Sequence, residues 1–223
     1  IVLVVATGAV SAGEVGSAHF VVEVTGFDIE AAEGGDRVRA EGLGIIGAAG
    51  EPDLPGKIYV VSVPPGAEVA SVRVEPAAPV PIAGNHTLRP TPLRRVLGDE
   101  DPAIAAEWRE EWERARAAVY GDDGPYPSSP AVLVGEAAYR RYSLVTVRVA
   151  PFRYHPRSES LEYYPHLTVR VDFTLPDLPV PTVDDLLARP EARAQKVIAN
   201  YEQALSWYPA LPDAPEQGDR DLV

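Results

Sequence analysis

The chain has 223 residues, 46% of them hydrophobic and 24% charged, so it can bury the core of one large all-β domain or two small domains. Its net charge of −13 argues against nucleic acid as a partner, because binding to phosphates needs a basic surface. The absence of cysteine excludes disulfides, thiolate metal sites and a cysteine nucleophile within this chain.

The first twelve residues, Ile1–Ala12, are almost all apolar or small, and Val10-Ser11-Ala12 precedes Gly13. This pattern is typical of the apolar region and cleavage site of a secretory signal, and twelve residues are too few to span a membrane. A buried first strand is the alternative. We expect residues 1–12 to be the remnant of a signal peptide. The mature protein would then be secreted or at the cell surface, with no membrane attachment after the signal is removed.

Short strands separated by proline and glycine turns are expected in the first third of the chain. The expected segments are Ser17–Thr25, with Phe20, Val22 and Val24 on one face; Glu30–Ala40, as a weak strand or loop; Lys57–Val63; and Val69–Glu75. Lys57–Val63 is apolar on both faces, which is typical of a central strand of a sandwich. Turns are predicted at Glu51–Pro55 and Pro64–Ala67. The pattern predicts a mainly β protein, an antiparallel β-sandwich of jelly-roll type.

The middle of the chain contains a different kind of segment. Pro76–Pro92 is rich in proline and should be extended on the surface. Asp101–Tyr120 is predicted to be an inserted helix, because Asp101 can cap its first turn and Pro102 suits that turn. Apolar residues recur on one face of this helix: Ile104, Trp108, Trp112 and Ala115.

The stretch Tyr139–Phe173 carries the strongest strand pattern. Val145, Val147 and Val149 alternate with polar residues, and so do Leu167, Val169, Val171 and Phe173, with Thr168, Arg170 and Asp172 turned outward. A polar segment, Arg157–Ser160, lies between them. We expect one long antiparallel hairpin that turns at this segment, with the rest of the protein packed on it.

The last part of the chain predicts a C-terminal helix over Asp184–Tyr208, interrupted by Pro190. Val197, Tyr201, Leu205 and Tyr208 would share its apolar face. We therefore divide the chain into a sandwich over residues 13–181, a helix over residues 182–209 that packs on it or leads away from it, and a linker over residues 210–223. Asp221-Leu222-Val223 has the character of a strand that begins a downstream domain.

No catalytic, metal-binding or cofactor-binding pattern is found. The four histidines lack ligand spacing, and Asp122-Asp123-Gly124 lacks the remainder of a calcium loop. No serine lies in a nucleophile elbow, and no glycine run has the phosphate-binding pattern. Tyr154, Tyr163 and Tyr164 could stack on sugars, although packing across strands is the commoner role of such residues. The sequence therefore predicts no active site, no metal and no cofactor.

Several motifs occur in a characteristic order. They are Gly50–Pro55, Val63–Ala67, Pro90-Thr91-Pro92, Tyr126-Pro127 and the V-x-V-x-P-x-x-Y-x-P string of Val147–Pro156, followed by Leu161 and Tyr163. In this order and spacing, residues 17–208 resemble the N-terminal prodomain of gingipain-type cysteine peptidases, the C25 propeptide. In that family, the catalytic cysteine and histidine belong to the domain that follows.

The resemblance implies a β-sandwich that assists folding of the downstream cysteine peptidase domain, its partner, and keeps that domain latent. Latency in the family comes from a loop that offers a basic side chain to the specificity pocket. The matching segment is Pro92–Pro102, so Arg94 or Arg95 is the candidate inhibitory residue. The alternative is that both are solvated loop charges, and Arg140 and Arg141 are the next candidates.

The sequence leaves two other functions open. One is a noncatalytic adhesion or binding module of an exported multidomain protein, which would use the sandwich surface and exposed aromatic residues. The other, a hydrolase in its own right, has almost no support from the residues. A downstream domain with a paired histidine and cysteine would favour the prodomain over the adhesion module.

Overall fold

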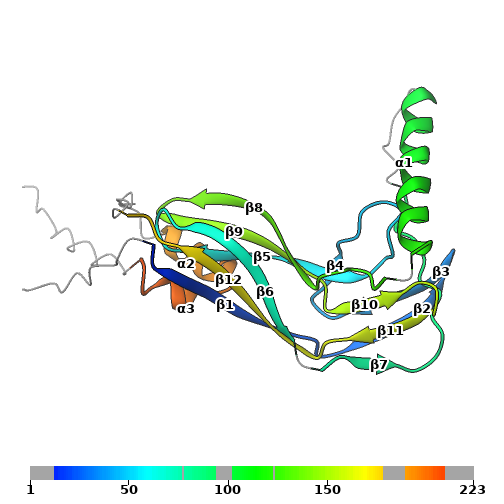
Figure 1. The fold of residues 1–223 in the computed structure, drawn as a ribbon, viewed down its shortest axis with the longest axis horizontal. Helices are drawn as coiled ribbons and strands as arrows, with labels where there is room; N and C mark the ends of the chain where they lie inside the picture. The colour runs from blue at the N-terminus through cyan, green and yellow to red at the C-terminus, as the bar shows by residue number, and fades with distance from the viewer. Residues whose placement is uncertain (1–12, 77, 94–101, 123, 178–188, 209–223) are drawn as a thin grey trace, which may run out of the picture.

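The computed structural model describes residues 13–76, 78–93, 102–122, 124–177 and 189–208. Within these ranges it contains twelve strands and three helices, arranged as an elongated body from which one helix projects (Figure 1). The expected signal segment over residues 1–12, the whole expected linker over residues 210–223 and both Arg94 and Arg95 lie outside the described residues.

Two antiparallel sheets face each other in the half of the molecule on the left of Figure 1, and of their strands only the short β4 (Gly44–Ile45) lies in the right-hand half. One sheet has the order β1-β12-β6, which are Val15–Glu23, His166–Thr174 and Glu68–Pro76. The other has the order β4-β5-β9-β8, which are Gly44–Ile45, Pro55–Val63, Tyr142–Val149 and Ala131–Tyr139. The main core lies between them and includes Phe20, Val61, Val145, Val147, Val149, Leu167, Val169, Val171 and Phe173, all buried. The β-sandwich expected from the sequence is confirmed.

The prediction that β9 and β12 form one long hairpin is wrong. Each strand has the predicted alternation, but β9 pairs with β5 and β8, whereas β12 pairs with β1 and β6. The two strands therefore contribute to the same core from opposite sheets. Alternation of apolar and polar residues shows that a strand has one buried face. The same alternation occurs in strands that share hydrogen bonds and in strands that pack face to face, so it does not distinguish the two arrangements. Only the expected turn is retained, as the short hairpin of β10 (Phe152–His155) and β11 (Ser160–Tyr163).

A second core lies in the other half of the body. It is formed by the sheet β10-β11-β7, with β7 at Val80–Ile82, and by the hairpin of β2 (Phe27–Ala32) and β3 (Gly35–Ala40). Its buried residues are Val38, Leu54, Leu88, Phe152, Tyr154 and Leu161. Tyr154 belongs to this core and Tyr164 to the main core, so these two rings pack inside the protein instead of offering a surface for sugars.

The C-terminal helices cover the outer side of β9. α2 (Arg189–Val197) and α3 (Tyr201–Ala204) pack with Tyr142 and Leu144 of that strand. The predicted apolar face is wrong at Val197, which is 50% exposed, whereas Ile198 is 4% exposed. The helical repeat stops here because Asn200 bonds to β5: its side chain accepts from the Ser62 amide at 2.8 Å and donates to the Ser62 carbonyl at 2.9 Å.

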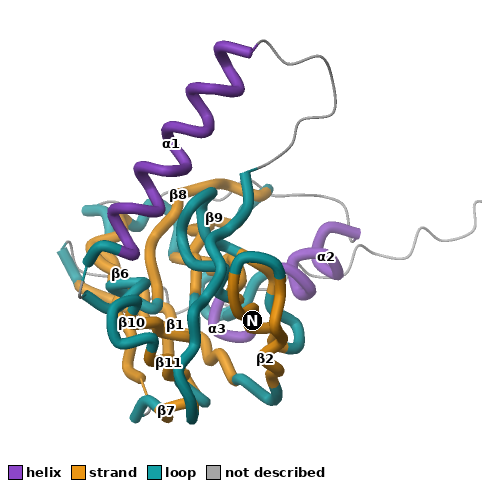
Figure 2. The backbone as a smooth tube through the Cα atoms, turned by 90° about the vertical axis from the view of Figure 1, so that its right-hand side faces the viewer, coloured by secondary structure: helices purple, strands orange, loops and turns teal. Residues whose placement is uncertain are grey.

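The inserted helix is present as α1, Pro102–Tyr120, and stands away from the body in two views (Figures 1 and 2). None of its residues is buried. Its expected cap, Asp101, lies outside the described residues. No helix in the described ranges is long and apolar enough to cross a membrane.

Asp172 differs from the expectation for an outward-facing strand residue, because it is only 3% exposed. Its carboxylate accepts hydrogen bonds from Arg73 at 2.6 Å, Arg170 at 2.9 Å and Ser71 at 3.0 Å. The side chain therefore faces away from the core and is covered by its own partners. The hydrogen bond from Arg73, supported by those from Arg170 and Ser71, lowers the pKa of Asp172 to about 2.

We expect the truncations Val147→Ala and Val169→Ala each to destabilise the sandwich, because each leaves a cavity in the main core. The loss should be somewhat less than the roughly 2–5 kcal/mol typical of larger aliphatic side chains. Thermal or urea unfolding measures it. Val21→Ala, at an exposed position of β1, is the matched control and should leave stability nearly unchanged. Wild-type stability of both core variants would contradict the assigned core faces.

Asp172 should also make stability depend on pH in acid. Because its folded-state pKa lies below the unfolded value of 3.8, its contribution is present above about pH 4 and is lost as the pH falls towards 2. We expect Asp172→Asn to lower the free energy of unfolding at pH 7 and to flatten its decline between pH 4 and 2. Urea unfolding across this range tests this. An equally steep decline in the variant would show that other groups cause it.

Candidate functional site

The segment Thr87–Leu93, here called the stem, leads directly to Arg94. On one side it is bound to β3, where the Asp36 amide donates to the Thr87 carbonyl at 2.7 Å and the Arg89 amide donates to the Asp36 carbonyl at 3.0 Å. Gly35 allows this approach, because a Cβ there would meet the stem backbone. The stem is thus held close against β3.

On its other side the stem is bound to the Gly50–Pro55 motif. The Asp53 amide donates to the Arg89 carbonyl at 3.0 Å, the Thr91 amide donates to the Glu51 carbonyl at 2.7 Å, and the Gly50 amide donates to the Thr91 carbonyl at 2.9 Å. Pro90 and Pro92 have no N–H, so two of the seven stem residues cannot donate a backbone hydrogen bond. The stem is therefore bound on both sides without forming a regular strand.

A buried ion pair fixes the middle of the stem. Asp53 is 0% exposed, and its Oδ2 accepts from Arg89 Nε at 2.7 Å and lies 2.6 Å from Arg89 Nη2. Arg37 Nε lies 3.7 Å from the same oxygen. The sequence predicts a turn at Glu51–Pro55 but does not indicate that Asp53 is buried there. The sequence pattern does not indicate these contacts, because both arginines are distant from Asp53 in the sequence. Arg89 belongs to the proline-rich segment, and Arg37 belongs to the expected weak strand.

The C-terminal half of α1 closes over the stem. Trp112 Nε1 donates to the Thr91 carbonyl at 2.8 Å, and the Tyr120 hydroxyl donates to the Leu88 carbonyl at 2.8 Å. Gly50, at φ +89°, lies so close to α1 that a Cβ would collide with the Trp112 carbonyl. Two stem carbonyls, of Leu88 and Thr91, are thus bound by the helix that follows the basic segment, Arg94-Arg95, in the sequence.

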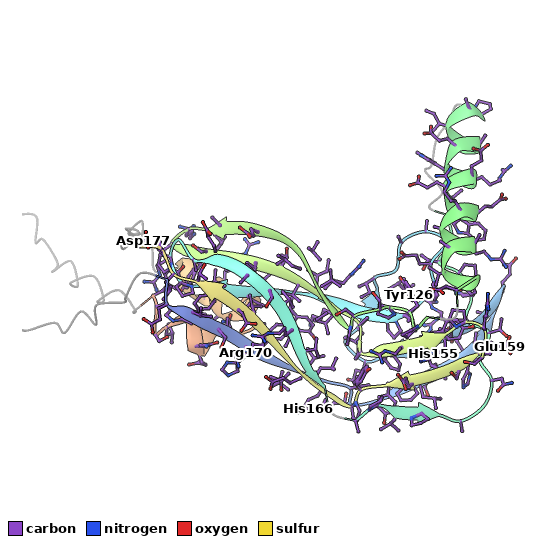
Figure 3. The ribbon with its side chains drawn as sticks, in the orientation of Figure 1. Tyr126, His155, Glu159, His166, Arg170 and Asp177 are labelled. Atoms are coloured by element: carbon purple, nitrogen blue, oxygen red, sulfur yellow. The ribbon has the colours of Figure 1, made fainter. Side chains whose placement is uncertain are left out.

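Tyr126 joins the motif residues from below α1 (Figure 3). Its hydroxyl donates to Glu51 Oε2 at 2.6 Å, and its backbone pairs with Tyr154 through two bonds of 2.7 Å. Burial, and then the hydrogen bond to Glu51, raise the pKa of Tyr126, so the phenol remains protonated and donates at neutral pH. Three of the sequence motifs, Gly50–Pro55, Pro90-Thr91-Pro92 and Tyr126-Pro127, therefore meet at the stem, together with Tyr154 of the Val147–Pro156 string.

Other candidates from the sequence lie elsewhere. The Val63–Ala67 motif forms the turn between β5 and β6, and Arg140 and Arg141 form the turn between β8 and β9, both at the end opposite to α1 (Figure 1). Arg141 is only 9% exposed. Neither arginine is therefore near the stem.

The described residues hold no group that could bind a metal ion through three or more His, Asp or Glu side chains. Three histidines lie near single carboxylates: His86 at 3.6 Å from Asp36, His155 at 3.8 Å from Glu162, and His166 at 3.7 Å from Glu23. These arrangements are pairs, and none of them forms a metal centre. The property that distinguishes the stem is its anchoring, by backbone hydrogen bonds on both sides and by the Asp53–Arg89 ion pair.

Comparison with known proteins gives a family match and structural matches for this chain. The Propeptide_C25 family model matches residues 28–206. No curated protein matches. Two solved structures share the fold at 18% and 17% identity: a complex of the Porphyromonas gingivalis RgpB pro- and mature domains, and a structure on the zymogenic latency of gingipain K from the same organism.

The structural match to the RgpB complex covers 83% of this chain and 93% of that chain, with a TM-score of 0.58. The match to gingipain K covers 74% of this chain and 94% of that chain, with a TM-score of 0.50. The family model spans well over half of the sequence and includes the motifs that meet at the stem. The chain belongs to the Propeptide_C25 family and is the noncatalytic propeptide region of a cysteine peptidase precursor.

Proposed function

We propose that this propeptide keeps the peptidase domain of its own precursor latent by offering Arg94 or Arg95 to the specificity pocket, and that it assists folding of that domain. The observation that carries the proposal is the double anchoring of the stem, bound to Asp36 on one side and to Gly50–Asp53 on the other. The stem ends at Leu93, immediately before the two arginines.

An anchored stem favours inhibition because it reduces the ordering cost of binding. A flexible segment loses conformational freedom when it binds, and a rigid attachment avoids part of that loss. The ion pair of Asp53 with Arg89 and the bond from Trp112 to Thr91 hold the backbone before Arg94. These contacts end at Thr91, so Arg94 is three residues, or at most about 11 Å of extended chain, from the last anchored residue.

Arginine also suits the proposed pocket. Its planar guanidinium forms paired, charge-assisted hydrogen bonds with a carboxylate, which are stronger than hydrogen bonds between neutral groups. A peptidase specific for basic residues needs such a carboxylate, so an inhibitor can satisfy it with an arginine. The same binding stabilises the native peptidase relative to its unfolded chain, which is how a propeptide can assist folding.

We also propose that the precursor is exported, because residues 1–12 have the pattern of a signal segment. An adhesion module is less well supported, because Tyr154 and Tyr164, two of the three tyrosines that could stack on sugars, are buried in the two cores.

Replacing Arg94 and Arg95 together with alanine should weaken inhibition of the mature peptidase domain by added propeptide. Losing a buried charge contact typically costs about 2–5 kcal/mol, or tens to thousands of fold in the inhibition constant. Circular dichroism should be unchanged. Arg140→Ala, in the turn at the opposite end, is the matched control and should inhibit like wild type. Equal constants for wild type and the double variant would rule out both residues.

Asp53→Asn should weaken inhibition about tenfold, because the stem loses the ion pair that positions it while the two arginines remain. Asp172→Asn is a matched control, since it also removes a buried ion-paired carboxylate, but one far from the stem. Inhibition constants are measured below the melting temperature of both variants. Asp172→Asn should retain full inhibition although it loses stability. Equal weakening in both variants would assign Asp53 a general role in stability alone.

A further inference from the structure

The projecting helix α1 has an apolar side that the described residues do not bury. Ile104 is exposed, and Trp108, Trp112 and Ala115 are half-buried, all at helical spacing. A helix with one apolar face normally packs that face against other protein. The C-terminal half of α1 is anchored to the stem by hydrogen bonds from Trp112 and Tyr120.

A groove of about 770 Å³ lies between this side of α1 and the body. Its walls include Ile45, Ala48, Ala49, Leu93, Trp108 and Trp112. Ile45 and Ala48 are exposed, so the wall opposite the helix is also apolar and accessible. Paired tryptophans in a partly enclosed apolar groove are typical of the residues that dominate binding at protein interfaces.

The groove is continuous with the proposed inhibitory segment. Leu93 lines it, and Arg94 and Arg95 are the next two residues, so both lie within about 7 Å of Leu93 along the chain. A protein that binds either arginine must therefore reach close to the groove.

The size of a stable interface also indicates that a partner bound at Arg94 or Arg95 contacts the groove. Specific complexes bury about 800 Å² on each partner, spread over roughly 20–30 residues. Two arginines and their immediate neighbours are too few for this, so adjoining surface of the propeptide must take part. The groove is adjoining surface that is both apolar and hollowed.

We propose that this groove takes an apolar side chain from the rim of the peptidase domain's substrate cleft, so that the peptidase is held at the basic segment and at α1. The inference rests on the proposed function for its partner. It assigns α1 a role of its own, as one wall of a second docking point beside the cleft.

Trp108 is the residue with which to test this. Trp112 also binds the stem through Thr91, so its removal would disturb the anchoring of Arg94 as well. Trp108 is half-buried and belongs to a helix with no buried residue, so Trp108→Ala should leave the fold and melting temperature unchanged. Ile45→Asp provides a second variant, because it puts a charge into the groove from the opposite wall. Glu110→Ala, on the opposite side of α1, is the matched control.

The experiment measures dissociation constants of the propeptide for two forms of the mature peptidase domain: one with a free active site and one covalently blocked by a small substrate-like inhibitor. Trp108→Ala and Ile45→Asp should each weaken binding about tenfold to a hundredfold to both forms. Glu110→Ala should bind like wild type. Because the blocked form cannot accept Arg94 or Arg95, its binding reports the groove separately from the basic segment.

The outcomes separate the two proposals. If blocking has no effect on wild-type binding but Trp108→Ala still weakens it, the groove is right and the basic segment is wrong. If Trp108→Ala and Ile45→Asp bind both forms like wild type, the groove does not contact the peptidase and the inference is overturned. A change only in self-association or in melting temperature would likewise overturn it, by showing that a second copy or this chain itself fills the groove.

Discussion

The buried contact between Asp53 and Arg89 joins the parts of the molecule that carry its proposed function. Arg89 lies in the middle of the stem, and Asp53 belongs to the segment that approaches the sandwich at β5. Removing Arg89 would leave the fully buried Asp53 carboxylate with only the more distant Arg37, at 3.7 Å, and breaking a buried ion pair typically costs several kcal/mol. The pair therefore penalises any shift of the stem relative to the body. The backbone bonds on both sides and the two bonds from α1 act in the same direction.

The two cores have different roles in this arrangement. The main core joins two sheets through regular alternation, and it forms a stable base whose outer side is covered by α2 and α3. The second core is built from short strands, turns and aromatic residues, and it buries Leu88 of the stem itself. The stem is thus part of a core instead of a loop on its surface. This explains how a proline-rich segment with few amides can be held in place.

Several features of the fold follow from the sequence because they depend on local periodicity. The faces of β9 and β12, the turn after His155 and the extent of α1 are examples. Features that depend on distant partners do not follow. Residues far away in the sequence decide whether β9 and β12 pair or face each other. They also decide which side of the C-terminal helix is buried around Ile198, and they cause the burial of Asp53 and Asp172. For the site, the motifs identify the correct segments, and the structure supplies the contacts that bring them to the stem.

The central claim is that the anchored stem delivers an arginine to the peptidase. A structure of the precursor with both domains in place measures this most directly, through the distance between the guanidinium of Arg94 or Arg95 and the nearest carboxylate of the peptidase's specificity pocket. The account predicts a charge-assisted hydrogen bond of about 2.7–2.9 Å for one of the two residues. Both guanidinium groups in solvent, with the pocket empty or filled by another part of the propeptide, would contradict it.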